Sequence, residues 1–320
     1  MLVSSNGGND GDVYVVENTG SIWEAAWTLR GSLEWVGLDT TKTDFNAFVS
    51  LSQMVDLDLD GMKDLVYFSR FNGLEIWHRI KISGPERFVQ RKMWSLDNEK
   101  FAMQIAPVAV DLNGDGKQDL VVGSRDLGLV YFQFKGLSSN GTGIEYQEKI
   151  TLLDQDGSAL DDGNCGGNSC SRPAFIDIGN DNDFDLILGT CSEGLWYYEN
   201  IGTPTNYTFV RRVDWVLKDA CNVAGCWVSA GHFDDDKLMD LAVGNSVETW
   251  KVKLYKQTTG SEENAALNFA YQPTWGDYNL GVHHYGGVTF GDLDGDGDDD
   301  AITGGQLGKV RYYERTGTLT

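Results

Sequence analysis

Basic residues are scarce in this chain, and their scarcity excludes two classes of partner. The 320 residues include 25 Lys and Arg against 48 Asp and Glu, which gives a formal net charge of -23 at pH 7. Nucleic acids are bound through basic patches that neutralise phosphates, and anionic membrane surfaces attract the same side chains. We therefore expect this chain to bind neither nucleic acid nor an anionic membrane surface.

Long apolar runs and catalytic motifs are missing as well. No apolar run approaches the ~20 residues of a transmembrane helix, so we expect no membrane insertion. The chain has 4 His and contains no G-x-S-x-G, H-E-x-x-H or nucleotide-binding loop. The sequence therefore favours a protein without enzymatic activity.

A short acidic loop, by contrast, occurs five times, and each copy is followed by β-forming residues. Its pattern is D-x-D-x-D-G-x-x-D, and the copies are loop one (56–64), loop two (111–119), loop three (177–185), loop four (232–240) and loop five (292–300). Ca²⁺ takes six to eight oxygen ligands, which alternating short acids can supply, and Gly at position 6 permits a sharp bend. An EF-hand would need Glu at position 12, which none of the copies has. We predict calcium loops inside β-hairpins rather than plain polar turns, because the pattern recurs at near-regular spacing.

The predicted calcium ligands are the acids and the amide at positions 1, 3, 5 and 9, and we expect three to five bound ions. They are Asp56, Asp58, Asp60 and Asp64; Asp111, Asn113, Asp115 and Asp119; Asp177, Asp181 and Asp185; Asp234, Asp236 and Asp240; and Asp292, Asp294, Asp296 and Asp300.

Two loops depart from the pattern. Loop three has Gly179 at position 3 and Asn182 at position 6, so we expect intermediate binding there. Loop four has His232 at position 1 and Lys237 at position 6, and His is a poor ligand for a hard cation. We expect loop four to bind calcium weakly or not at all, and we expect His232→Asp to raise its occupancy.

The spacing of the loops predicts the architecture. The repeat is about 60 residues long, with turn residues every ~8–12 residues, which indicates about four strands in each unit. Such a unit cannot bury both faces alone, and radial stacking of four-stranded blades solves this problem. We predict an all-β fold, a β-propeller with the calcium loops between strands one and two of the blades. A single domain would cover residues 1–320, with a partial first blade at 1–50 and repeats that start near residues 51, 106, 172, 227 and 287.

The loops and their flanks closely resemble FG-GAP/VCBS repeats, as the segment from Ala106 to Gly123 illustrates. Integrin α-subunit propellers and integrin-like fungal lectins carry the same unit. The resemblance implies that ligands bind on the face opposite the calcium loops, where aromatic rings beside polar groups would suit sugars. The candidate residues on that face are Trp227, Trp275, Tyr278, His284 and Tyr285. Any one of these aromatic rings could instead pack between blades.

The two ends of the sequence align with each other. Residues 7–20 match residues 304–317, so the chain begins inside one blade and ends inside another. We expect a six-bladed ring that closes by pairing the two partial blades. A seven-bladed ring is the alternative, and it would need residues upstream of this sequence.

The five cysteines and the calcium loops indicate an extracellular or cell-surface protein. Cys165 and Cys170 form one C-x4-C pair and Cys221 and Cys226 form another, at matching places in two successive repeats. Local disulfides are the preferred interpretation, and a zinc site is the alternative, although the usual C-x2-C spacing is missing. Cys191 is left over. The first eight residues do not resemble a signal peptide, so secretion would require that this sequence is a mature or partial one.

These observations predict an extracellular, calcium-stabilised recognition module that binds a glycan or a protein. One alternative is a structural subunit of a surface filament, joined to its neighbours by strand pairing through the terminal blades. Another is a carbohydrate-active enzyme of the lyase type, since related propellers include such enzymes.

Overall fold

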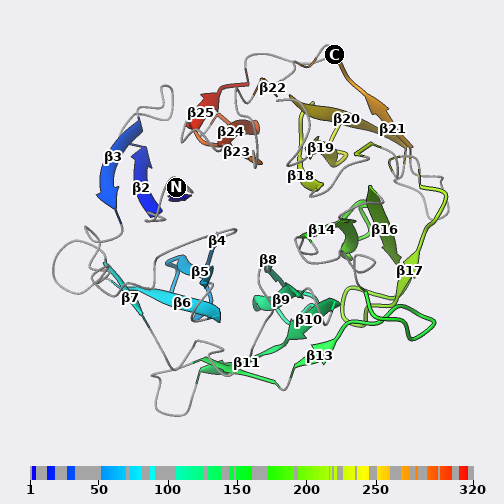
Figure 1. Cartoon of the computed structure of the whole chain (residues 1–320), viewed down its shortest axis with the longest axis horizontal. Coiled ribbons are helices and arrows are strands. Elements are labelled where there is room, and N and C mark those ends of the chain that lie inside the picture. The colour runs from blue at the N-terminus through cyan, green and yellow to red at the C-terminus, as the bar shows by residue number, and fades with distance from the viewer. Residues whose placement is uncertain are drawn as a thin grey trace. The chain divides into compact units, whose positions relative to one another are not determined.

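The computed structural model consists of β-strands and the loops that join them (Figure 1). It describes residues 2–4, 13–18, 27–32, 52–69, 73–80, 87–90, 106–124, 128–137, 144–147, 149–160, 172–190, 194–215, 217, 220–221, 226–234, 236–244, 251–259, 268–273, 275, 278–279, 287–294, 296–304 and 310–315. Across these ranges every regular element is a strand, and no candidate membrane-spanning helix is found.

One antiparallel sheet illustrates how each repeat is built. It contains β14 (Arg172–Ile176), β15 (Asp185–Gly189), β16 (Leu195–Asn200) and β17 (Phe209–Arg211) in that order. Ile176 pairs with Asp185, so loop three is the connection between the first two strands. All five side chains of β15 are buried. A continuous apolar run forms this second strand because both of its faces are covered.

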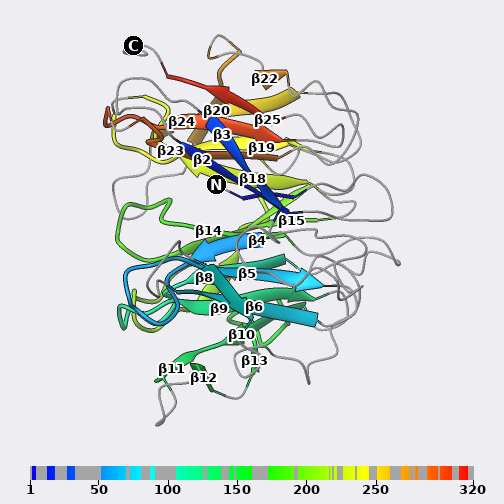
Figure 2. The same ribbon diagram turned by 90° about the vertical axis from the view of Figure 1, so that its left-hand side faces the viewer.

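Residues 1–17 and 29–171 form one compact unit, here called unit 1. One of its sheets contains β4 (Ser52–Val55), β5 (Asp64–Ser69), β6 (Gly73–Ile80) and β7 (Arg87–Gln90). Another has the order β13-β10-β9-β8, from β8 (Ala106–Val110), β9 (Asp119–Ser124), β10 (Gly128–Phe132) and β13 (Ile150–Thr151), and its antiparallel strands lie side by side in Figure 2. A separate hairpin joins β11 (Phe134–Leu137) to β12 (Ile144–Tyr146). Buried side chains from both sheets and the hairpin, such as Val66, Leu120 and Phe134, share one core.

Residues 18–28 and 172–320 form the second compact unit, unit 2. Beside the sheet β14–β17, it has β18 (Trp227–Gly231), β19 (Asp240–Gly244), β20 (Lys251–Thr259) and β21 (Asn268–Tyr271), with β22 (Tyr278–Asn279) paired to β20. A three-stranded sheet follows, with β23 (Gly287–Gly291), β24 (Asp300–Gly304) and β25 (Val310–Tyr313). β18 packs against both β14 and β23, so the three sheets of unit 2 adjoin one another through their first strands.

The two incomplete sheets lie at the ends of the sequence. β1 (Leu2–Ser4), β2 (Val13–Asn18) and β3 (Trp27–Ser32) form one sheet, and β23–β25 form the other. Within the described strands each of these sheets pairs only with itself, so the expected pairing between the partial blades is not seen there. The all-β fold of blade-like antiparallel sheets is confirmed, whereas the number of blades and the single domain stay predictions.

Cys221 and Cys226 form a disulfide, with an S–S distance of 2.05 Å. Both residues are buried in the core that the sheets β14–β17 and β18–β21 share. The local pairing predicted for these two cysteines is therefore confirmed. Cys165, Cys170 and Cys191 lie outside the described residues.

Candidate calcium-binding loops

The acid at position 9 begins the second strand of its repeat and is the buried anchor of each loop. These residues are Asp64, Asp119, Asp185, Asp240 and Asp300, all at most 4 % exposed. In each repeat the Oδ1 atom accepts a backbone N–H at 2.7 to 2.9 Å from a residue near the end of the third strand or two residues beyond it. A buried carboxylate needs such donors because water cannot reach it. The anchor therefore fixes the position of the loop against the third strand.

The second oxygen of the anchor has donors of its own. In loops one, four and five the Oδ2 atom accepts the N–H of position 2, at 3.0 to 3.2 Å. In loops two, three and five it accepts a hydroxyl, from Tyr131, Tyr197 and Tyr312, at 2.6 to 3.0 Å. These three tyrosines were not among the residues predicted from the sequence. Their common spacing, twelve residues after the anchor, is the signal that could have revealed them.

The acids at positions 1 and 5 accept hydrogen bonds from backbone N–H groups of their own loop, and these bonds fold the loop back on itself. In loop two, Asp111 accepts the N–H of Asp115 at 3.0 Å and that of Gly116 at 2.8 Å, and loops one and three repeat both bonds. In all five loops the acid at position 5 accepts the N–H of position 7, at 2.8 to 3.1 Å. Position 6 has a positive φ of 66 to 98° in all five loops, which explains the preference for Gly.

This curl gathers carboxylate oxygens in two of the loops. One oxygen from each of Asp56, Asp58 and Asp60 lies within 4.8 Å of the others, and so does one from each of Asp292, Asp294 and Asp296. A set of clustered carboxylate oxygens suits a hard divalent cation such as Ca²⁺. The residues of loops one and five therefore fit calcium by the chemistry of their donors.

Loop three compensates for its missing ligand with other acids. A Cβ atom at Gly179 would lie 3.1 Å from Oδ2 of Asp181, so that carboxylate fills the space of the absent side chain. Asp183, at position 7, is 6 % exposed and adds a further acid. Burial, followed by repulsion from Asp181, raises the pKa of Asp183 to about 7. Burial likewise raises the pKa of Asp185 to about 8, against its hydrogen bonds. A bound cation would relieve this accumulation of negative charge.

Loop four gathers protein cations around its acids. The Lys256 ammonium is ion-paired with Oδ2 of Asp234 and lies 3.2 Å from Oδ2 of Asp236. Burial alone would raise the pKa of Asp234, but the hydrogen bonds from Lys256 and Asp236 outweigh it and lower that pKa. His232 turns its Nδ1 atom toward the Leu238 carbonyl, at 3.0 Å. At the sequence position where the other loops have an acid, His232 therefore contacts a backbone carbonyl.

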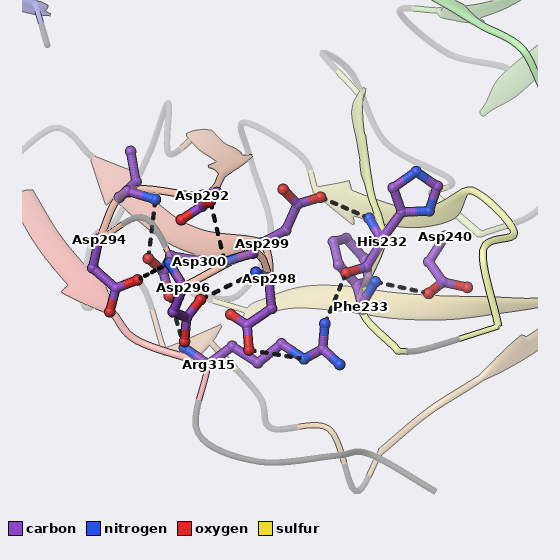
Figure 3. Close-up of polar contacts among 12 residues, drawn as sticks. His232, Phe233, Asp240, Asp292, Asp294, Asp296, Asp298, Asp299, Asp300 and Arg315 are labelled. Atoms are coloured by element: carbon purple, nitrogen blue, oxygen red, sulfur yellow. Dashed lines mark hydrogen bonds and ion pairs between the residues drawn. The ribbon is translucent and has the colours of Figure 1, made fainter. Parts of the chain in front are cut away.

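Loops four and five are joined by hydrogen bonds (Figure 3). The Asp299 carboxylate accepts the His232 backbone N–H at 2.9 Å, and the Arg315 guanidinium donates to the His232 carbonyl at 3.5 Å. The Arg315 side chain also lies 3.8 Å from Asp298. Arg315 therefore contacts both loops, and its backbone N–H binds the anchor Asp300 at 2.9 Å.

His78 is a further residue that the sequence pattern did not reveal. It is buried in β6 beside loop one, and its Nδ1 atom lies 3.0 Å from Oδ1 of Asp64 and 3.3 Å from Oδ2 of Asp58. It immediately precedes Arg79, whose N–H binds the anchor Asp64. Burial and the Asp64 charge raise the pKa of Asp58, while His78 opposes that shift.

Two of the residues predicted for a ligand face have packing roles in the structure. Trp227 is 9 % exposed, and its indole covers Gly244, where an added Cβ atom would lie 2.1 Å from the ring. Trp275 is half-buried and meets Phe233 edge to face, with ring centroids 6.1 Å apart. Tyr278 lies in β22, and His284 and Tyr285 fall outside the described residues. Sugar contact by any of these residues stays a prediction.

Comparisons with known proteins support the repeat and the fold. Residues 56–122 match the FG-GAP-like repeat, which covers loops one and two with the strands between them. AofleA from Arthrobotrys oligospora is similar in structure, with a TM-score of 0.50 and 13 % identity over 99 % of this chain and 83 % of that one. A lectin from Agrocybe aegerita, described as recognising non-reducing terminal N-acetylglucosamine, has a TM-score of 0.47 and 15 % identity over 95 % of this chain and 74 % of that one. No curated protein matches the chain significantly. The sequence-based resemblance to FG-GAP-like repeats is confirmed over residues 56–122, and the structural similarity to AofleA supports an all-β propeller fold.

Proposed function

We propose that this chain is a non-enzymatic recognition module of the cell exterior, which binds calcium in its acidic loops and a glycan on another surface. The observation that carries the calcium part is the convergence of three carboxylate oxygens in each of loops one and five. The glycan part follows from the resemblance to integrin-like fungal lectins. The FG-GAP-like repeat over residues 56–122 supports that resemblance.

Calcium would have a structural role in this proposal. Asp56, Asp58 and Asp60 would hold one ion and Asp292, Asp294 and Asp296 another, while the anchor acids keep the loops fixed to the third strands. A bound divalent cation supplies positive charge where acids otherwise repel each other across a short distance. Each ion would then stabilise one hairpin, and loop two would act in the same way through Asp111, Asn113 and Asp115.

Thermal unfolding with calcium and with EDTA, together with an ion count by native mass spectrometry, tests the calcium part. We expect three or four ions and a midpoint that falls on chelation. A ligand present at about 100 times its Kd stabilises a fold by ~2.7 kcal/mol per site. A protein without ions, whose midpoint EDTA leaves unchanged, would contradict the proposal and leave the loops as polar turns.

A glycan array tests the recognition part. The calcium-loaded protein should bind a defined set of glycans and should leave them chemically intact, as mass spectrometry of the recovered glycan would measure. Release of an unsaturated sugar from an acidic polysaccharide would instead establish the lyase alternative. The native mass spectrum also measures self-assembly, because a filament subunit would give oligomers at low concentration.

A further inference from the structure

We propose that Lys256 is the built-in cation of loop four, and that its ammonium group takes the place a calcium ion occupies in the other loops. This inference deepens the proposed calcium binding and rests on it for the other loops. It assigns a cation-selecting role to a residue outside the acidic motif, on the third strand of the repeat.

The contacts of Lys256 are those that a cation in this loop would make. Its Nζ atom is bonded to Asp234 at position 3 and lies 3.2 Å from Asp236 at position 5. The Asp234 side chain is 2 % exposed, while that of Lys256 is 29 % exposed. A buried carboxylate is strongly unfavourable unless it is paired. Lys256 therefore meets the need that a metal ion would otherwise meet.

His232 completes the replacement. The backbone carbonyl at position 7 is a calcium ligand in the EF-hand, and we expect the same role in these loops, but here the Nδ1 atom of His232 lies 3.0 Å from the Leu238 carbonyl. A carbonyl only accepts hydrogen bonds, so Nδ1 must carry the proton. The carboxylate at position 1 is lost in the same substitution. A calcium ion in loop four would thus lack the carboxylate ligand at position 1, and the carbonyl at position 7 would already be hydrogen-bonded to His232. The acids at positions 3 and 5 would already be paired with the Lys256 ammonium group.

The residue just before the one whose backbone N–H binds the anchor differs among the five repeats. In the repeats of loops one to five this residue is His78, Gln133, Glu199, Lys256 and Glu314, respectively. Lys256 is the one side chain of this set that carries a permanent positive charge. It occurs in the repeat that also has His at position 1. The two differences therefore act together: His232 removes a carboxylate ligand for calcium, and Lys256 neutralises the acids that would attract it.

The consequence is a hairpin that needs no metal. Loop four should keep β18 and β19 connected in their present geometry at any calcium concentration. Through the His232 bonds to Asp299 and Arg315 it also contacts loop five, which we propose does need calcium. The number of calcium ions on the chain should then not exceed four.

A pair of substitutions tests this assignment. His232→Asp combined with Lys256→Gln gives loop four the residue types of loop two, where Asp111 and Gln133 occupy these positions. Native mass spectrometry in calcium should count one more ion on this double variant than on the wild type. His232→Asp alone should leave the count unchanged, because Lys256 still occupies the two acids; this replaces the expectation from the sequence alone that His232→Asp would raise the calcium occupancy of loop four.

A second measurement needs no calcium. In EDTA, Lys256→Gln should lower the unfolding midpoint by about 5 °C, because it leaves the buried Asp234 without its cation. The matched control is Lys253→Gln on the same strand, whose exposed Nζ lies 3.5 Å from a backbone carbonyl and whose loss should shift the midpoint by no more than about 1 °C.

These measurements test the role of Lys256 and the calcium proposal separately. An extra ion on His232→Asp alone, or equal midpoints for Lys256→Gln and Lys253→Gln in EDTA, would overturn the role of Lys256. A wild-type protein without ions would overturn the calcium proposal for the other loops. The EDTA comparison would still decide whether Lys256 holds loop four together.

Discussion

Loops four and five are neighbours in unit 2, and they balance their acids in different ways. Loop five carries acids at positions 1, 3, 5, 7, 8 and 9, and oxygens of the first three converge within 4.8 Å. Loop four has lost the first acid and holds two others with Lys256. Both loops nevertheless keep a buried anchor that accepts the N–H of position 2 and a second backbone N–H, from Gln257 in β20 or from Arg315 just beyond β25. The comparison teaches that the anchor sets the loop conformation in both loops, while the source of positive charge, by our proposal, differs between them.

The anchors should give the largest effects, whether or not calcium is present. Asp300 accepts hydrogen bonds from Leu293, Tyr312 and Arg315, whereas Asp240 accepts two, from Phe233 and Gln257. A buried donor without a partner costs roughly 1–3 kcal/mol. We expect Asp300→Ala to lower the free energy of unfolding by about 4 kcal/mol and Asp240→Ala by about 3 kcal/mol in EDTA. Urea denaturation measures both, and losses under about 1 kcal/mol would contradict the anchor role.

The acids at position 5 should separate the two loops through calcium. Asp296→Ala should remove one ion from the native mass spectrum and lower stability in calcium by ~2–3 kcal/mol, because a proposed ligand is lost. Asp236→Ala should leave the ion count unchanged, because Lys256 already occupies that acid. Loss of an ion from the second variant would show that both loops bind metal.

The pH dependence should differ between the chelated and the calcium-loaded protein. Burial raises the pKa of Asp240 to about 7, and burial and Asp296 raise that of Asp298 to about 6. Both values lie above the ~3.9 of an unfolded Asp, so the folded chain binds more protons, and this contribution to stability is lost as pH rises through 6 and 7. We expect the midpoint in EDTA to fall between pH 5 and pH 8, and calcium to reduce that fall. A midpoint in EDTA that rises over this range would contradict the assignment.

The smallest effect should come from position 6, where the two loops use different residues. Lys237 has φ of 66° and Gly297 has φ of 98°. A side chain other than Gly in this left-handed region costs about 1 kcal/mol. Lys237→Gly should therefore stabilise loop four by about 1 kcal/mol, and Gly297→Ala should destabilise loop five by a similar amount. Urea midpoints measured in EDTA test both, and shifts in the same direction would contradict this explanation.

Much of the fold could be predicted from the sequence, because its main signals are local. The first strands begin at Ser52, Ala106, Arg172, Trp227 and Gly287, and each precedes an acidic loop that the pattern reveals by itself. The pairing of Cys221 with Cys226 is local as well. Such features need no knowledge of how distant strands align.

The side chains that neutralise the acids of each loop could not be predicted in this way, because the register between the second and third strands determines which residue reaches the loop. In four repeats the N–H that binds the anchor comes from the residue fifteen positions later, but Gln257 follows Asp240 by seventeen. A comparison of repeats at fixed spacing therefore misses Lys256. The burial of Trp227 was unpredictable for a similar reason, since it depends on how closely the backbone at Gly244 approaches the ring.

The separation between anchor and charge source has an evolutionary consequence. Because every repeat keeps its loop shape through one buried aspartate, a lineage can change the cation requirement of a single repeat without disturbing the others. Loop four differs from loop two at two positions of this kind, His232 and Lys256. The cation requirement of such a chain could thus change by one or two substitutions at a time, repeat by repeat, while the scaffold is retained.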